Sequence, residues 1–328
     1  MSFDIGKNIH LTIFGQSHSK AIGAVIEGLP AGFKIDMRAL KAFMARRQPG
    51  QKGTTARKEA DQPVILSGLV DGRTCGSPLA MMIENNDARS AEYKDFKWIP
   101  RPMHADYPAF VKYEGYNDIA GGGHFSGRLT APLCFAGGVC LQLLSKQGVK
   151  IVAKLTSAGG VQGKKMQECI RAAQDAGDSV GGIVECCITG VKAGVGDSGF
   201  DSLESSLSRV LFSIPGVKGV EFGAGFEAAA MKGSQHNDAW CFDKEGNVRT
   251  RTNNHGGILG GLSTGMPIVF RVAFKPTPSI ALPQESVDLK TGKVAVLEIK
   301  GRHDPCIAVR AVPCVEAAAA LVLCDYML

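Results

Sequence analysis

Two histidines have neighbours that suit an imidazole for proton exchange. Small residues surround one of them and leave its ring accessible, and an acidic residue follows the other. His18 follows an expected strand and stands between Gly15 and Ser19 in FGQSHSKAIG, and His104 precedes Asp106 by two positions in RPMHADY. Histidine has the unperturbed side-chain pKa closest to neutral pH, so either residue could act as a general acid. The alternative for each is an imidazole that only forms hydrogen bonds at the surface.

A third histidine adjoins an acidic residue near the C-terminal end of the chain. GRHDPC places Arg302, His303 and Asp304 side by side before a proline, with Arg310 a few residues further on. Asp304 could orient the imidazole of His303, or it could serve as a carboxylate base. Neighbouring side chains can equally point apart and face solvent, so both interpretations stand.

Two glycine-rich stretches are suited to holding an anion or a planar ligand. GGGHFSGR at residues 121–128 places glycines before His124, Ser126 and Arg128, at the start of an expected helix, where phosphate or carboxylate groups bind readily. RTNNHGGILGGLSTG at residues 251–265 carries five glycines, which let backbone N–H groups approach a ligand without obstruction. A glycine turn before a helix is common, so the first motif alone does not establish a site.

A basic loop lies between these motifs and the N-terminus. MARRQPGQKGTTARKEADQ spans residues 44–62, and its basic side chains are Arg46, Arg47, Lys52, Arg57 and Lys58. Around a proline and glycines, such a loop is typical of a lid that closes over an anion. The alternative is a solvated basic loop, because most runs of charge only face water.

The periodicity of apolar residues predicts the elements that must position these motifs. Helices are expected over residues 127–148, 165–176, 200–214 and 314–327, the third with a capping-box-like pair at Asp201 and Glu204. Strands are expected over residues 10–14, 22–27, 183–190, 217–222 and 268–274. Because helices and strands do not alternate strictly, the pattern favours an α+β fold. No repeat or linker divides the sequence, so we expect a single domain over residues 1–328.

The composition restricts the class of protein. The chain has 45% hydrophobic and 21% charged residues and a net charge of +6, which suits an enzyme of anionic metabolites. Ten cysteines without a C-x-x-C pair indicate reduced, mostly buried thiols in the cytoplasm. The sequence has neither a membrane-length apolar run nor a histidine spacing for metal, so we expect no membrane and no metal. We also expect no nucleic acid as a partner, because a basic stripe interleaved with aromatic residues is missing.

Seven separated motifs together resemble the chorismate synthase family, in that family's order. They run from about Asn8 to Asp325 and read FGQSHS, RRQPG, RPMHADY, GGGHFSGR, SIPGVKGVEFGAGF, NNHGGILGGLSTGMPIVFRVAFKPTPSI and GRHDPCIAVRAVPCVEAAAALVLCD. The resemblance implies a lyase that converts 5-enolpyruvylshikimate 3-phosphate to chorismate and phosphate. That reaction is an anti-1,4-elimination, the last step of the shikimate pathway, and it requires reduced FMN. The resemblance also implies a sandwich of helices between antiparallel β-sheets and a cytoplasmic homotetramer, with NADPH as a possible reductant.

The resemblance assigns roles to individual residues. The catalytic residues would be His18, His104 and Asp304. The cofactor contacts would be Arg47 (towards NADPH) and, towards the flavin, His124, Phe125, Ser126, Pro215, Gly216, Gly260, Lys275, Pro276, Thr277, Pro278, Ser279 and Arg302. A substrate with one phosphate and two carboxylates needs several fixed cations, for which we choose Arg46, Arg47, Arg128 and Arg310.

The sequence departs from the family pattern at the proposed flavin site. The family commonly has arginine and then a small residue where this chain has His124 and Phe125, so a permanent cation is replaced by a titratable group. This departure motivates a second hypothesis, a catalytically impaired relative that binds FMN without turnover. The basic loop is also shorter than usual by about one residue, which puts the role of Lys52 in doubt.

Overall fold

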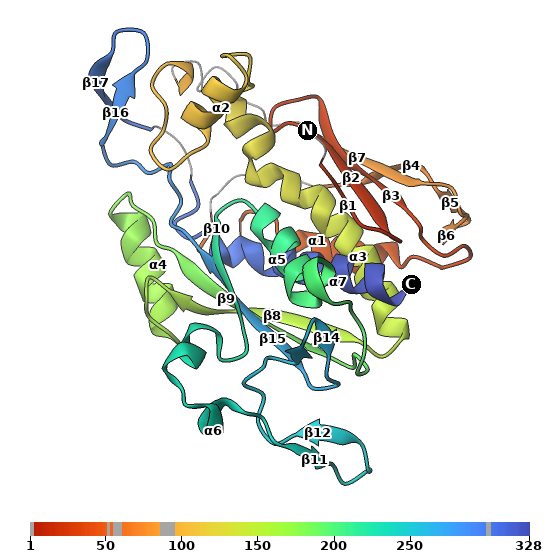
Figure 1. The fold of residues 1–328 in the computed structure, drawn as a ribbon. Helices are drawn as coiled ribbons and strands as arrows, with labels where there is room; N and C mark the ends of the chain where they lie inside the picture. The colour runs from red at the N-terminus through yellow and green to blue at the C-terminus, as the bar shows by residue number, and fades with distance from the viewer. Residues whose placement is uncertain (1–2, 51–52, 55–60, 86–95, 300–302) are drawn as a thin grey trace.

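Two antiparallel β-sheets lie on either side of a layer of helices in the computed structural model, which describes residues 3–50, 53–54, 61–85, 96–299 and 303–328 (Figure 1). The first sheet has the order β1-β2-β3-β7-β4 and the second has the order β10-β15-β9-β8. The first consists of β1 (Asp4–Ile5), β2 (His10–Gly15), β3 (Ala21–Glu27), β7 (Leu79–Glu84) and β4 (Val64–Ser67). The second consists of β10 (Val217–Phe222), β15 (Ile268–Phe274), β9 (Gly182–Thr189) and β8 (Lys150–Ala158). This arrangement confirms the predicted α+β sandwich.

The helices of the central layer are α1 (Met37–Ala45), α3 (Thr130–Lys146), α5 (Leu203–Ser213) and α7 (Ala308–Met327). Helix α3 contacts strands of the first sheet, α7 contacts β8 and β9 of the second, and the two helices pack against each other. The remaining helices are α2 (Asp106–Lys112), α4 (Lys165–Asp175) and α6 (Gly233–His236), with short 3-10 segments over Ala120–Phe125, Gly127–Leu129, Gly199–Asp201 and Gly225–Ala230.

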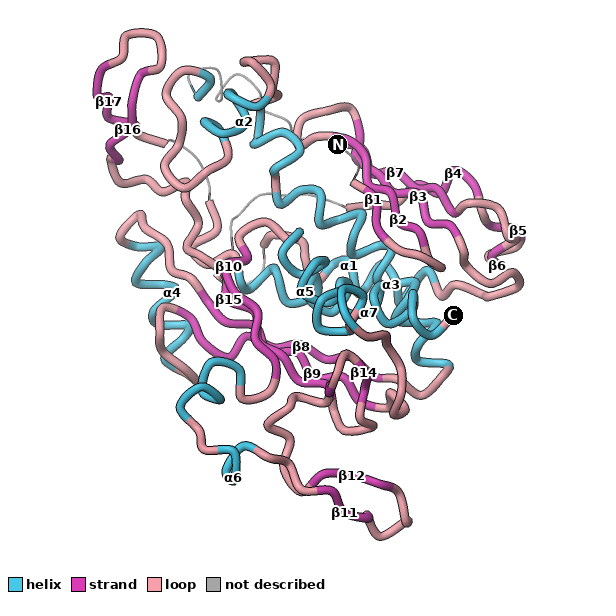
Figure 2. The backbone as a smooth tube through the Cα atoms, viewed as in Figure 1, coloured by secondary structure: helices cyan, strands magenta, loops and turns pink. Residues whose placement is uncertain are grey.

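Four two-stranded hairpins complete the part of the chain that the structure describes. They are β5 (Leu69–Val70) with β6 (Arg73–Thr74), β11 (Trp240–Phe242) with β12 (Val248–Thr250), β13 (Ile258–Leu259) with β14 (Leu262–Ser263), and β16 (Gln284–Asp288) with β17 (Lys293–Leu297). The β11–β12 and β16–β17 hairpins extend away from the helical layer (Figure 2).

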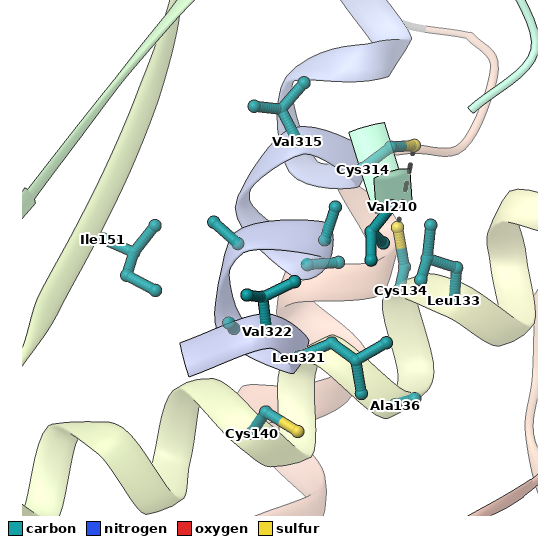
Figure 3. Packing of buried hydrophobic residues seen from close by; sticks show 14 of the residues in the cluster. Leu133, Cys134, Ala136, Cys140, Ile151, Val210, Cys314, Val315, Leu321 and Val322 are labelled. Carbon is teal, nitrogen blue, oxygen red and sulfur yellow. Dashed lines mark hydrogen bonds between the residues drawn. The ribbon is translucent and has the colours of Figure 1, made fainter. Parts of the chain in front are cut away.

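Small residues allow α3 and α7 to approach closely. Residues 317–320 of α7 are four consecutive alanines, all fully buried. A Cβ atom on Gly137 of α3 would lie only 2.3 Å from the Cα and Cβ atoms of Ala317. Buried side chains such as Val315 and Leu321 fill the space around this contact (Figure 3). The main core cluster includes residues from Ile9 to Cys324 and therefore joins both sheets through the helices.

The predicted helices and strands are all present in the structure, and two details were wrong. Helix α7 begins at Ala308, several residues before the predicted start. At α5 the cap is Ser202, whose hydroxyl oxygen accepts a hydrogen bond from the N–H of Ser205 at 3.2 Å, so the predicted pair of Asp201 and Glu204 does not form the cap. Helix α1 and strands β4, β7 and β8 were not predicted.

The 3-10 turn before α3 and α3 itself form one helical segment, Gly127–Lys146, that is long and apolar enough to cross a membrane. Of its most apolar stretch, 78% is buried inside the protein. Since α3 lies between two sheets, its apolar surface contacts other parts of the same chain.

The close crossing of α3 and α7 predicts the effect of a single methyl group. Gly137→Ala should destabilise the fold by about 1–3 kcal/mol because the new Cβ overlaps Ala317. In an open helix the same change would stabilise by up to about 1 kcal/mol, so the sign of the effect is informative. The control is Gly233→Ala, which meets nothing within 4 Å. Denaturant unfolding measures both, and a Gly137→Ala variant as stable as the control would contradict the account.

Candidate active site

A cavity of about 820 Å³ lies where α3 and α7 begin. The first sheet contributes apolar side chains to its wall, and the turn between α5 and β10 contributes Pro215 and Gly216. Among the described residues, six basic and two acidic side chains line it. They are Arg47, Arg128, Arg209, Lys218, Lys275 and Arg310, with Asp4 and Asp304. Both helices also direct the positive ends of their dipoles towards it, so the cavity favours an anion.

His104 is held by an acid that is itself held by an arginine. The Nδ1 atom of His104 lies 2.6 Å from Oδ1 of Asp106, and Arg101 donates to both oxygens of that carboxylate at 2.7 and 2.8 Å. Burial alone would raise the pKa of Asp106, but the hydrogen bonds from Arg101 and His104 hold it well below its usual range. A proton on Nδ1 therefore faces Asp106, and Nε2 is the atom available to exchange protons towards the cavity.

A run of three left-handed glycines fits against both predicted histidines. Gly121, Gly122 and Gly123 have φ values of 60°, 86° and 53°. A Cβ on Gly121 would lie 2.7 Å from Nε2 of His18, and one on Gly122 would lie 3.1 Å from Nε2 of His104. Any larger residue at these positions would push the imidazoles away. The glycine turn thus places the two rings beside consecutive backbone positions.

The turn that carries His18 is fixed to the same glycine segment. The N–H of Ser17 donates to the carbonyl of Gly123 at 3.0 Å, and the hydroxyls of Ser126 and Ser17 lie 3.2 Å apart. Ser17 and Gly121 line the cavity, whereas His18 lies directly behind Gly121. His18 therefore stands at the edge of the cavity.

One buried carboxylate joins two of the arginines. Asp61 accepts a hydrogen bond from Arg47 at 2.6 Å and another from Arg128, whose Nε also donates to Asn85 at 3.0 Å. The side chain of Asp61 is fully buried. Burial raises the pKa of Asp61, but the charges of Arg47 and Arg128 outweigh that effect and lower it. Asp61 thus holds two guanidinium groups at the cavity wall.

Asp304 also lines the cavity, in a network with Arg310. Arg310 donates to Oδ2 of Asp304 at 2.7 Å and to the backbone carbonyl of Arg47 at 2.8 Å. The hydroxyl of Thr277 donates to the backbone carbonyl of Asp304 at 2.6 Å. Arg310 thereby joins the basic segment after α1 to the start of α7, with a carboxylate facing the cavity.

His124 lies in an aromatic environment at the cavity wall. Its ring centroid lies 4.1 Å from that of Phe125, 5.7 Å from that of Tyr113 and 6.3 Å from that of Phe3. Burial lowers the pKa of His124, so the ring is mainly neutral at pH 7. Its Nε2 atom is buried and has no hydrogen-bond partner among the described residues. A polar ligand in the cavity could supply that partner.

Lys275 reaches the cavity from the end of β15. Its ammonium group donates to the carbonyl of Met103, whose φ of 55° is left-handed, and this contact steadies the turn before His104. Burial, with the nearby charge of Lys218, lowers the pKa of Lys275. An anion bound beside Lys275 would relieve that repulsion.

Comparisons with known proteins identify the kind of site. The profile described as chorismate synthase matches residues 9–328. The chain belongs to the chorismate synthase family. The chorismate synthases of Thermococcus kodakarensis and Chitinophaga pinensis are 46% and 45% identical to it, over 98% of this chain and 97% and 96% of theirs. A solved structure described as "Crystal Structure of Chorismate Synthase" has a TM-score of 0.76 and 26% identity, covering 98% of this chain and 92% of that chain. The chain is therefore an enzyme of aromatic biosynthesis that acts on a small molecule.

The structure places most of the residues predicted for a chorismate synthase site at this cavity. The lining includes Arg47, His104, His124, Phe125, Ser126, Arg128, Pro215, Gly216, Lys275, Pro278, Asp304 and Arg310. Pro276, Thr277 and Ser279 are neighbours of the lining residues Lys275 and Pro278 in the sequence. The hydroxyl of Thr277 also donates to the backbone carbonyl of Asp304, which lines the cavity. Gly260 lies in the β13–β14 hairpin, away from the lining. Arg302 and Lys52 fall outside the described residues.

Arg46 has a different environment from the other predicted arginines. Its guanidinium donates to Glu316 of α7 at 2.6 and 3.0 Å, and Glu316 also accepts the N–H of Ala153 at 2.8 Å. Glu316 is buried, and Arg46 is not part of the cavity lining. This pairing joins α1 to α7, so the predicted contact of Arg46 with substrate gains no support from the structure.

Several residues of the site were not predicted. Asp61 carries no signal of its own in the sequence, since its importance comes from the arginines that it holds, and Asp106 was noted only as an acidic neighbour of His104. Arg209 and Lys218 line the cavity from α5 and β10. Lys218 lies inside the SIPGVKG motif and could have been found there, whereas Arg209 looks like any polar position of an amphipathic helix.

The buried ion pairs of Asp61 predict a pH-dependent loss of stability. Asp61→Asn should destabilise the fold by about 3–5 kcal/mol at pH 7, because two arginines lose a buried partner. Since folding lowers the pKa of Asp61 from 3.8, its contribution is present above about pH 4 and is lost as the pH falls further. The difference from wild type in denaturant unfolding should therefore shrink below about pH 4.

Glu185→Gln is the matched control, because Glu185 pairs with the exposed Lys154 at 3.1 Å. That change should cost no more than about 1 kcal/mol. Equal losses for Asp61→Asn and Glu185→Gln would show that the Asp61 pairs do not stabilise the site.

Proposed function

We propose that this chain converts 5-enolpyruvylshikimate 3-phosphate to chorismate and phosphate by anti-1,4-elimination, with reduced FMN bound in the cavity. The observation that carries the proposal is one cation-rich cavity lined by His104 and Asp304, with His18 packed against Gly121 at its edge. The reaction would be the last step of the shikimate pathway. Family membership supports it, since the curated relatives are named chorismate synthase.

The cavity residues fit a flavin and a substrate together. About 820 Å³ lies within the range of about 300–1,000 Å³ that ligand pockets occupy. The apolar wall of Leu11, Ile13 and Leu133 suits a planar ring, and the buried Nε2 of His124 offers it a polar contact. His124, Phe125, Ser126, Pro215, Gly216, Lys275 and Pro278 are the described lining residues proposed to hold FMN. When bound, reduced FMN supplies electron density transiently to the reacting substrate.

The arginines are proposed to fix the substrate's anionic groups. Arg128 and Arg310 line the cavity, each already held at another part of its guanidinium by Asp61 or Asp304. Arg47 lies deeper, and although burial opposes its charge, Asp61 raises its pKa above the ordinary value. These groups therefore stay cationic without moving, which lowers the cost of orienting them for a phosphate and carboxylates.

The proposed proton transfers use the two histidines and Asp304. His18, at the edge of the cavity, would donate a proton to the leaving phosphate. Asp304 would help to remove the substrate proton from the carbon at the other end of the allylic system, and Arg310 holds it in place. His104 would hold or exchange a proton at Nε2, since Asp106 fixes Nδ1. Arg101 and Asp106 act through His104 and are positioning residues.

We further propose a cytoplasmic homotetramer that uses NADPH as a possible reductant. The cellular location, the oligomeric state and the reductant all rest on the resemblance to the family. Arg47 is already committed to Asp61 and Thr130, at 2.6 and 3.3 Å, so substrate orientation is the better supported of its two proposed roles.

The second candidate function is binding of FMN without turnover, and it is favoured only by His124 and Phe125. A neutral His124 would give the flavin weaker electrostatic attraction than an arginine. His18, His104 and Asp304 are nevertheless all present around the cavity, which favours the active lyase.

The proposal predicts chorismate and phosphate in equal amounts from an anaerobic incubation with chemically reduced FMN. His18→Ala should lower kcat by about 10²–10⁴-fold, because a general acid is lost. The control is His236→Ala, a histidine on α6 outside the cavity lining, which should leave kcat unchanged. Release of phosphate and absorbance of chorismate measure the rates.

Two results would contradict the proposal in different ways. No turnover despite tight binding of FMN would favour the impaired relative. Turnover that is unchanged in His18→Ala would leave the lyase in place but remove His18 as its acid.

A further inference from the structure

Two cysteines face each other in the wall of the cavity. The thiol of Cys134 on α3 points to the sulfur of Cys314 on α7, with an Sγ–Sγ distance of 3.8 Å (Figure 3). Cys314 lines the cavity, whereas Cys134 is fully buried behind it. None of the roles proposed above uses either thiol.

The surroundings make the two thiols unequal. The hydrogen bond from Cys134, together with the charge of Arg47 and a contact with Thr130, lowers the pKa of Cys314 despite its burial. Burial and the neighbouring Cys314 raise the pKa of Cys134 well above its ordinary value. A thiolate beside a protonated thiol is the arrangement in which one sulfur attacks and the other resolves.

The same two helices carry a second pair of hydrogen-bonded thiols, in which that contact and burial raise the pKa of Cys140. Cys140 and Cys324 are both buried, and the thiol of Cys324 donates to the carbonyl of Cys140 at 3.7 Å. Neither residue lines the cavity. This pair is therefore an internal control with the same helices and similar burial.

We propose that Cys134 and Cys314 form a redox-active dithiol, which hydrogen peroxide oxidises to a disulfide in the cavity wall. The thiolate of Cys314 attacks one peroxide oxygen, so the O–O bond breaks and Cys314 becomes a sulfenic acid. The hydroxide that leaves takes up the proton that the Cys314 thiol had released and becomes the first water. The sulfur of Cys134 then attacks Cys314, the S–O bond breaks, and a second water forms with the thiol proton. The two sulfurs lose two electrons, and peroxide becomes two waters.

In the second step the two sulfur atoms have only a short distance to move. The sulfurs must close from 3.8 Å to the S–S bond length of about 2.05 Å, which side-chain rotation and a small shift of helices can provide. Formation of the disulfide removes the negative charge of the Cys314 thiolate. Arg47 then loses one of the nearby negative charges that raise its pKa. Oxidation would then alter the electrostatics of the wall that faces the bound anions.

A source of peroxide follows if the proposed function holds. Reduced flavin that meets dioxygen in this cavity would yield hydrogen peroxide next to Cys314. The dithiol itself needs no flavin, so only the flavin as the source of peroxide rests on the proposed function.

The first arm of the test uses the full wild-type chain without flavin. The protein is treated with hydrogen peroxide at pH 7, alkylated with N-ethylmaleimide under denaturing conditions and analysed by intact mass and peptide mapping. The expected result is two fewer alkylated thiols than the ten of the untreated chain, with a peptide that links Cys134 to Cys314. Cys140 and Cys324 should stay alkylated.

Two outcomes would overturn the proposal. One is full alkylation of Cys134 and Cys314 while the exposed Cys75 is oxidised, and the other is equal cross-linking of the Cys140 and Cys324 pair.

The variant Cys134→Ser gives a further check. Without the second thiol, oxidation of Cys314 should end at a sulfenic acid, which dimedone traps. Trapping of dimedone at Cys75 alone would also count against it.

The second arm replaces added peroxide with reduced FMN and air, with and without catalase. A disulfide that forms only without catalase supports the flavin as its source. A disulfide in the first arm and none in the second would leave the dithiol established and would count against the flavin as the source of oxidant.

Discussion

The close contact between α3 and α7 is the constraint on which the rest of the structure depends. Gly137 and Ala317 let the helices cross with almost no side chain between them. Because the two helices also contact opposite sheets, this crossing sets the spacing of the sandwich. Both helices begin at the cavity, so the same crossing decides how far apart Arg128 and Arg310 stand. A methyl group added at Gly137 would therefore change the spacing of Arg128 and Arg310 at the site.

The site keeps its cations charged by pairing them with carboxylates that are also fixed. Asp61 and Asp304 each hold one edge of an arginine and leave the rest of the guanidinium to the cavity. Leaving such a charge buried alone would be costly, and letting it move would weaken its hold on a bound anion. The histidine rings pack against backbone glycines, and His104 is also held by the carboxylate of Asp106. Arg128 lies just before α3 and Arg310 lies in α7, whereas turns carry His18 and His104.

The sequence predicted the parts of this arrangement that have a local signal. Apolar periodicity predicted α3, α4, α5, most of α7 and five strands, and the family motifs predicted most of the cavity lining. Strands such as β8 were missed because several of its positions remain polar. The burial of Asp61 and the pairing of Arg46 with Glu316 could not be predicted, because each depends on residues far apart in the chain. The sequence of a basic loop does not show which arginine faces a ligand and which one pairs with a carboxylate on a helix.

The central claim is that one cavity, at the start of α3 and α7, holds both the flavin and the phosphorylated substrate. The most direct measurement is a crystal structure of the chain with oxidised FMN and 5-enolpyruvylshikimate 3-phosphate, since the oxidised cofactor keeps the substrate intact. The account predicts the flavin ring against His124 and Pro215, and the substrate's anionic groups on Arg128 and Arg310. Density for either ligand only at another place, such as the β13–β14 hairpin around Gly260, would contradict it.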